Sequence, residues 1–319
     1  AMAVAAGASL SFSSYYSEEG GSEVYQFQSG SIVEGAGAVR FQSGTAHVNG
    51  GYTVSGQTVI SGGMANFSQG VTLGQVAVSG GTANFDQNAV FDTLTLSGGT
   101  LAGAGTVTIS EALTWTGGRM SGTGATVIAA GGAAMLNAGA YSTLALDRAW
   151  INQGTVLWTG GSLMVQAGGS IENQAGAVFD ARTGGSLGSE YGDTTGTFTN
   201  AGTFLKSAGT GPAYIGMPFD NQSGGLLEVS TGKLRFWQDL TNSGTVNIGP
   251  GTALEVSDYY YYEEQATGEY LQTAGQTTLL GGTLSAGDRV LLGGGSLSGY
   301  GTIHGKLQSG GELRPGTAD

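Results

Sequence analysis

The chain has 319 residues, of which 62 are glycine, four are proline and none is cysteine. Its net charge of −13 at pH 7 argues against nucleic acid or an anionic membrane surface as a partner. No strict glycine triplet occurs, which excludes collagen, and 39% hydrophobic with only 10% charged residues favours a packed core over disorder. No apolar run reaches the roughly 18 residues that a membrane-spanning helix needs, so no membrane insertion is expected.

The first residues indicate a piece of a larger protein. Ala1 and Met2 resemble a scar left by an expression vector. We therefore expect residues 3–319 to be one continuous fragment of a longer tandem-repeat protein. The sequence GASLSFSSYYSEE follows at residues 7–19, and a related sequence returns near the other end of the chain.

A short repeat organises residues 61–102. SGGMANF at residues 61–67 returns as SGGTANF at residues 79–85, and SGGTLA follows at residues 97–102, so the step is 18 residues both times. Each copy is a glycine-rich turn followed by a short strand. If Ala65 and Phe67 point inward, Asn66 points outward, because successive strand residues face opposite sides. A short constant period predicts a solenoid, in which stacked neighbours bury a face that one unit cannot bury alone.

The middle of the chain carries a second regular feature, an asparagine followed by glycine and a strand. These asparagines are separated by 21, 27, 21 and 21 residues and are Asn152, Asn173, Asn200, Asn221 and Asn242. A coil of about 21 residues explains the common spacing, and a six-residue insertion within residues 183–196 explains the longer one. Equivalent asparagines on stacked coils are expected to form an amide ladder.

The predicted fold is therefore all-β: a single-stranded parallel β-helix, or β-solenoid, with 18–21 residues per coil and about 15 coils. Loop insertions are expected near residues 13–23, 183–196 and 257–268. The first and last belong to a longer repeat, since GTALEVSDYYYYEE at residues 251–264 matches the sequence that begins at Gly7, with a constant offset of 244 residues.

Several short sequence motifs resemble the repeat regions of autotransporter-like and haemagglutinin-like bacterial surface adhesins. They include FTNAGTF at residues 198–204, LTNSGTV at residues 240–246 and the ending GGELRPG at residues 310–316. The resemblance implies a right-handed parallel β-helix located outside the bacterial cell. It implies adhesion, matrix attachment or the presentation of other domains on a rigid rod, and it transfers no catalytic residue.

The expected contact residues combine aromatic rings with carboxylates. Tyrosines can stack on sugar rings or anchor a protein, and carboxylates can bind hydroxyls or calcium, although no calcium motif is present. The expected partners are a glycan or protein of a host, bacterial or matrix surface, and neighbouring repeats of the parent chain. The candidate residues are Tyr15, Tyr16, Glu19, Glu190, Tyr191, Tyr259, Tyr260, Tyr261, Tyr262, Glu263 and Glu264.

Two other functions stay open. A pure structural stalk needs no ligand, and a carbohydrate-active β-helix would bind or cleave a polysaccharide with clustered carboxylates and a basic residue. The residues that such an enzyme would use are Asp180, Arg182, Glu190, Asp193, Lys233, Arg235 and Asp239. No motif pairs them, so the chain is not expected to be an enzyme. With no cysteine and only two histidines, no zinc site and no cofactor are expected.

Overall fold

A computed structural model of the chain describes residues 1–13, 23–139, 142–166, 168–189, 196–257 and 267–316. These residues form the strands β1 to β33 and no helix, in a parallel β-solenoid of about 14 turns with about 20 residues each, which confirms the predicted fold class. No helix among them is long and apolar enough to cross a membrane. The chain divides into two compact units, Ala1–Trp150 and Ile151–Asp319.

The first unit consists mostly of short strands, with longer ones at β10, β12, β13 and β15. They are β1 (Met2–Ala3), β2 (Ser9–Phe12), β3 (Val24–Phe27), β4 (Ile32–Gly35), β5 (Ala38–Phe41), β6 (Thr45–Val48), β7 (Gly51–Val54), β8 (Gln57–Ile60), β9 (Met64–Phe67), β10 (Val71–Val78), β11 (Thr82–Phe85), β12 (Ala89–Ala102), β13 (Val107–Ile128), β14 (Ala133–Asn137) and most of β15 (Thr143–Asn152). Met2 is part of this fold, since it pairs with Val33 of β4.

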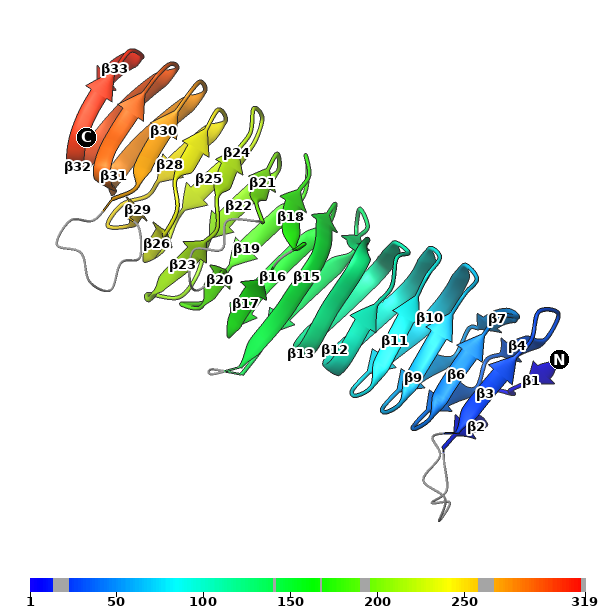
Figure 1. Cartoon of the computed structure of the whole chain (residues 1–319). Coiled ribbons are helices and arrows are strands. Elements are labelled where there is room, and N and C mark those ends of the chain that lie inside the picture. Colours follow the sequence, from blue (N-terminus) through cyan, green and yellow to red (C-terminus); the bar gives the residue numbers. More distant parts are fainter. Residues whose placement is uncertain (14–22, 140–141, 167, 190–195, 258–266, 317–319) are drawn as a thin grey trace. The chain divides into compact units, whose positions relative to one another are not determined.

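The 18-residue repeat sets the strand register in the first unit. Met64 of β9 pairs with Thr82 of β11, which pairs with Thr100 of β12. The neighbouring strands β3, β6, β9 and β11 lie side by side in Figure 1. The sequence thus predicts which residues stack, because one repeat is one coil.

Alternation along these strands separates core from surface as expected. Ala65, Phe67 and Phe85 are fully buried, whereas Asn66 is half-buried and points outward. The rings of Phe67 and Phe85 stack with centroids 4.7 Å apart and an interplanar angle of 6°. The glycines of the repeat permit the tight corner, because Gly81 has a φ of 66° and a Cβ there would lie 2.3 Å from the carbonyl oxygen of Gly63.

One arginine is buried in the core of the first unit. Arg148 is fully buried and its guanidinium donates hydrogen bonds to four backbone carbonyl oxygens, at distances from 2.7 Å for Gly105 to 3.3 Å for Ser121. Burial lowers the pKa of Arg148 to about 10. The side chain stays protonated at neutral pH and satisfies carbonyls of two successive turns.

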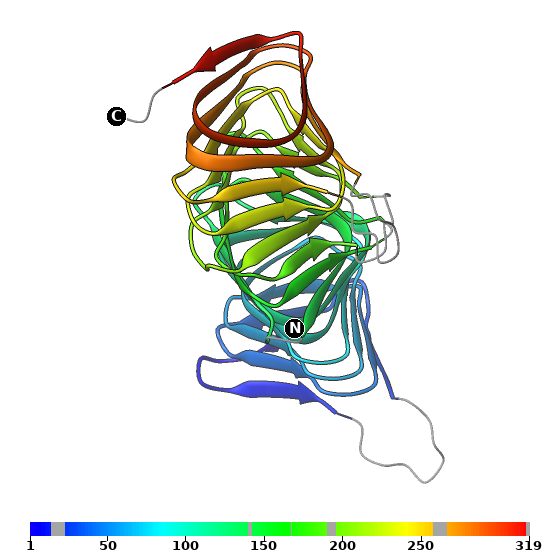
Figure 2. The same cartoon turned by 90° about the vertical axis from the view of Figure 1, so that its left-hand side faces the viewer.

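The second unit contains three columns of parallel strands, each column formed by every third strand. The strands are β16 (Thr155–Gly160), β17 (Ser162–Val165), β18 (Ser170–Asn173), β19 (Val178–Ala181), β20 (Ser186–Gly188), β21 (Phe198–Asn200), β22 (Thr203–Lys206), β23 (Pro212–Gly216), β24 (Phe219–Asn221), β25 (Leu226–Val229), β26 (Lys233–Phe236), β27 (Leu240–Asn242), β28 (Thr245–Ile248), β29 (Ala253–Val256), β30 (Glu269–Gln272), β31 (Gln276–Leu292), β32 (Ser296–Ser309) and β33 (Glu312–Pro315). Figure 2 shows how its turns wind around a common interior.

The columns end together on β31, which pairs with β28, β29 and β30 in succession. We name them by the strands they contain: the first column is β16–β19–β22–β25–β28, the second is β17–β20–β23–β26–β29, and the third is β18–β21–β24–β27–β30. Phenylalanines fill the interior between them. The rings of Phe179 and Phe204 stack with centroids 5.4 Å apart, and those of Phe198 and Phe219 stack at 4.8 Å.

Part of the range expected to hold the six-residue insertion, residues 183–196, is regular strand. Residues 186–188 form β20, which pairs with β17 and β23 as an ordinary member of the second column. The long repeat also has a structural counterpart, because the matched residues Ser9 and Ala253 each begin a strand, β2 and β29.

Candidate functional site

The aromatic and acidic residues expected to make contacts lie outside the residues that the structure describes. These residues are Tyr15, Tyr16, Glu19, Glu190, Tyr191, Tyr259, Tyr260, Tyr261, Tyr262, Glu263 and Glu264. Their anchoring strands are described. In the second unit, residues 190–195 connect β20 to β21 and residues 258–266 connect β29 to β30, so both stretches connect the second column to the third.

The five asparagines with regular spacing form a continuous chain of amide hydrogen bonds inside the second unit. All five are fully buried, and the side-chain NH₂ of each of the first four donates to the Oδ1 of the next asparagine at 2.7 or 2.8 Å. The same NH₂ groups also donate to a backbone carbonyl of the next turn, as Asn200 does to Leu226 at 3.0 Å. A buried amide without partners would be costly, so the ladder is possible only because every turn repeats it.

The ladder has a further member that its spacing does not reveal. Asn242 donates to the side-chain oxygen of Gln272 at 3.4 Å, and the NH₂ of Gln272 donates to the carbonyl of Ser296 at 3.1 Å. Gln272 is also fully buried. The residue type changes there and 30 residues separate the two amides, so only the strand pairing of β27 with β30 identifies the position.

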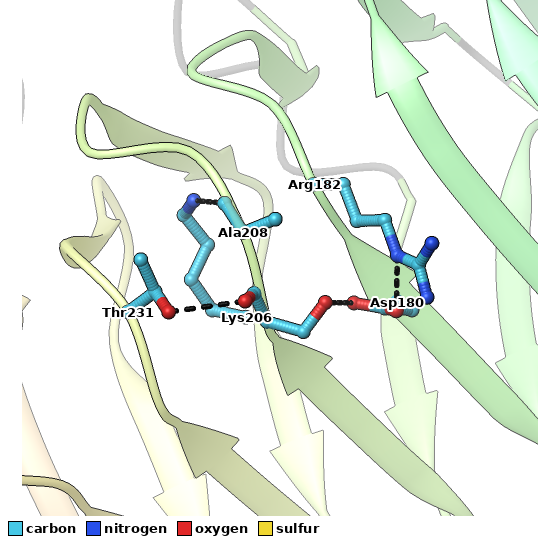
Figure 3. A network of polar contacts seen from close by, with 6 residues as sticks. Asp180, Arg182, Lys206, Ala208 and Thr231 are labelled. Atoms are coloured by element: carbon cyan, nitrogen blue, oxygen red, sulfur yellow. Dashed lines mark hydrogen bonds and ion pairs between the residues drawn. The ribbon is translucent and has the colours of Figure 1, made fainter.

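A polar network lies where the first column turns into the second (Figure 3). The carboxylate of Asp180 on β19 accepts hydrogen bonds from Arg182 Nε at 2.7 Å and from Ser207 Oγ at 2.6 Å. The Asp180 side chain is 4% exposed and that of Arg182 is 46% exposed. The backbone carbonyl of Ser207 accepts from Thr231 Oγ1 at 3.0 Å, so the network crosses three consecutive turns.

Lys206 is the buried cation beside this network. Its ammonium group donates to the carbonyl oxygens of Ala208 and, at 2.9 Å, of Gly209. Burial lowers the pKa of Lys206, and the nearby Asp180 carboxylate opposes that shift. The ammonium therefore holds the turn at residues 207–211 closed from the inside.

The other residues considered for an enzyme do not form one cluster, and each makes a separate contact within the fold. Lys233 forms an ion pair with Glu255 at 2.6 Å, and Asp239 accepts the backbone N–H of Glu269 at 2.8 Å. Asp193 lies outside the described residues. Within the part of the chain that the structure describes, no group of three or more histidine or acidic residues is arranged to hold a metal ion.

An aromatic pair lies on the outer face of the second column and was not singled out from the sequence. The rings of Tyr214 on β23 and Trp237, which directly follows β26, have centroids 5.0 Å apart and planes tilted by 33°. Both side chains are half-buried. Arg235 lies directly beside Tyr214 on the neighbouring strand, and Glu255 lies beside Arg235. This is the one place among the described residues where an aromatic pair and a guanidinium share an outward face of the second unit.

The position of Trp237 depends on a missing side chain. Gly216 lies two residues after Tyr214, and a Cβ on Gly216 would lie 2.6 Å from the carbonyl oxygen of Ser189 and 2.9 Å from Cε3 of Trp237. The indole therefore covers the glycine backbone and reaches Tyr214. Gly216 can be seen in the sequence, but its contact with Trp237 follows only from the register of the paired strands.

Comparisons of the chain with protein-family models, with curated proteins and with solved structures found no match.

Proposed function

We propose that the chain is a repeat segment of an extracellular bacterial surface protein and works as a stiff scaffold for adhesion, matrix attachment or presentation of other domains. The observation that carries the proposal is that the buried polar groups described above form hydrogen bonds with other groups of the protein. The amide ladder from Asn152 to Gln272, the Asp180 network and the Lys206 ammonium are each satisfied by protein groups. A repeat fold whose interior polar groups are hydrogen-bonded in this way is stiff, and a stiff fold is suited to present binding residues on its surface.

The resemblance of its repeat phrases to bacterial adhesins supports the location and the role. The net charge of −13 supports a partner other than nucleic acid. The second candidate function is carbohydrate binding, which the outward pair of Tyr214 and Trp237 favours, because aromatic faces stack on sugar rings. Cleavage of the carbohydrate has no such support, since Asp180 is held by Arg182 and Ser207.

Adhesion of coated beads tests the proposal. Beads carrying the full chain are expected to attach to bacterial cells, host cells or extracellular matrix more than beads carrying serum albumin, and soluble chain should compete. Equal attachment of both kinds of bead to all three surfaces would contradict the adhesive role.

A further inference from the structure

We propose that Tyr214, Trp237 and Arg235 form a binding site for a sugar ring that bears a carboxylate, as in a uronic-acid oligosaccharide. This inference gives a ligand class to the adhesive role and rests on it. It uses only side chains on the outer face of the second column, and it involves none of the tyrosine–glutamate stretches considered from the sequence.

The two aromatic rings of the site are preorganised for a ligand. Trp237 fills the space above Gly216, and its ring meets the ring of Tyr214 at 5.0 Å. Two half-buried rings held in this way lose little conformational freedom when a ligand stacks on them. Rigid aromatic side chains supply large contact areas for recognition because they combine apolar faces with polar edges.

The charged part of the site lies next to the rings. Arg235 donates from Nε at 3.1 Å and from Nη2 at 2.8 Å to the hydroxyl of Ser257. Among the described residues it forms no ion pair, because the carboxylate of its cross-strand neighbour Glu255 is paired with Lys233 at 2.6 Å. The guanidinium has five N–H donors, so hydrogens on Nη1 and Nη2 are left for a ligand carboxylate. Ser257 orients the group, which lowers the entropy lost on binding.

The combination selects the ligand class. A neutral sugar would use the rings and leave the arginine without an anion, and an isolated anion would use the arginine and leave the rings without a partner. A carboxylate-bearing sugar ring uses both. A long polyanion is disfavoured by the net charge of −13, so short oligomers are the appropriate probe.

Calorimetric titration of the full chain tests the site with alginate hexamers, which are chains of uronic acid, and with maltohexaose, which is neutral. We expect saturable binding of alginate that weakens as salt is added, and much weaker binding of maltohexaose. Trp237→Leu and Arg235→Gln should each weaken alginate binding by about tenfold or more, which corresponds to one charge-assisted hydrogen bond or one aromatic contact. Arg235→Gln should leave the weak maltohexaose binding unchanged.

Gly216→Ala keeps all three binding side chains, but its Cβ would lie 2.6 Å from the carbonyl oxygen of Ser189 and 2.9 Å from Cε3 of Trp237, so it perturbs the neighbouring turn as well as the indole. It should weaken alginate binding, whereas Gly51→Ala should not, since a Cβ at Gly51 has its nearest neighbour at an ordinary 3.6 Å. Arg40→Gln is the matched control for Arg235, because Arg40 also points outward from a strand. Circular dichroism and thermal unfolding of each variant separate loss of binding from loss of fold.

Three results would overturn the site: no alginate binding, equal weakening in the control variants, or weakening by Trp237→Leu without weakening by Arg235→Gln. The last result would indicate a neutral glycan. Bead adhesion with unchanged alginate binding in all variants would reject this site and leave the adhesive role standing. Alginate binding that depends on Trp237 and Arg235 without bead adhesion would reject the adhesive role and leave the site standing.

Discussion

The side-chain NH₂ of Asn173 donates a hydrogen bond to Oδ1 of Asn200 at 2.7 Å, although 27 residues separate the two asparagines. The bond forms at the same position of the turn as those between asparagines 21 residues apart. Extra chain between turns therefore leaves the interior of the second unit unchanged. An insertion is accommodated outside the ladder, and the buried amides keep the register.

Removing a middle member of the ladder should destabilise the chain strongly. Asn200→Ala removes an acceptor for Asn173 and the donor to Asn221, and it leaves buried polar groups without partners. We expect a loss of about 3 kcal/mol in the free energy of unfolding, measured by urea denaturation. Asn247→Ala is the control, because Asn247 is half-buried and points outward from β28, and it should change stability by less than about 0.5 kcal/mol. Similar losses in both variants would contradict a structural role of the ladder.

The stacked phenylalanines of the first unit give a second prediction. Phe85→Ala removes a fully buried ring that stacks on Phe67 and meets Phe91 edge-on at 5.1 Å. The cavity should lower the free energy of unfolding by about 4 kcal/mol in urea denaturation. The adjacent Asn84→Ala should have an effect below about 0.5 kcal/mol, because Asn84 points outward and bonds only the exposed Asp86. A loss below 1 kcal/mol for Phe85→Ala would show that the stacked phenylalanines do not hold the turns together.

The buried guanidinium gives a third prediction. Arg148→Met fills similar space but leaves the carbonyls of Gly105 and Ala125, bonded at 2.7 and 2.9 Å, without that donor. We expect a loss of about 3 kcal/mol in the free energy of unfolding. The outward Arg40→Met should change it by less than about 0.5 kcal/mol. A stability for Arg148→Met equal to that of the unmodified chain would mean that these carbonyls need no side-chain donor.

Two buried tyrosines predict a loss of stability at alkaline pH. Burial raises the pKa of Tyr52 and of Tyr270 above the ordinary value of 10.0, while hydrogen bonds to Thr58 and Thr277 oppose the shift. Above pH 10 the unfolded chain then loses phenolic protons that the folded chain keeps, so the stabilising contribution is complete below pH 10 and falls as the pH rises. The slope is about 1.4 kcal/mol per pH unit for each tyrosine.

The comparison with Tyr52→Phe isolates that contribution. Urea denaturation from pH 9 to pH 11 should give a steeper loss of stability for the unmodified chain than for the variant. Absorbance of tyrosinate should show that two tyrosines ionise only when the chain unfolds. Parallel stability profiles of the two proteins would contradict the prediction.

Periodic features of the fold could be predicted because one repeat is one turn. The step from Phe67 to Phe85 predicts both the strand and its partner, and the spacing of Asn200 and Asn221 places two residues of one column. Local alternation predicts that Asn66 points outward, because it depends only on neighbouring residues.

Features that depend on strand pairing between turns of different sequence could not be predicted from the repeats. Gln272 continues the ladder with a different residue type at a different spacing, so no repeat identifies it. The pair of Tyr214 and Trp237 forms because Gly216 lacks a side chain opposite the indole, a relation that exists only once the register of β23 and β26 is known. The tyrosine–glutamate stretches lie outside the described residues and stay predictions.

The most direct test is whether the chain retains a uronic-acid oligosaccharide without shortening it. The immobilised full chain would be incubated with alginate hexamers, and both the retained amount and the oligomer length would be measured by size-exclusion chromatography. We expect retention that is lost in Trp237→Leu, with the oligomer length unchanged. Shortened oligomers from the unmodified chain, together with intact oligomers from Asp180→Asn, would contradict a binding role and indicate a carbohydrate-cleaving enzyme.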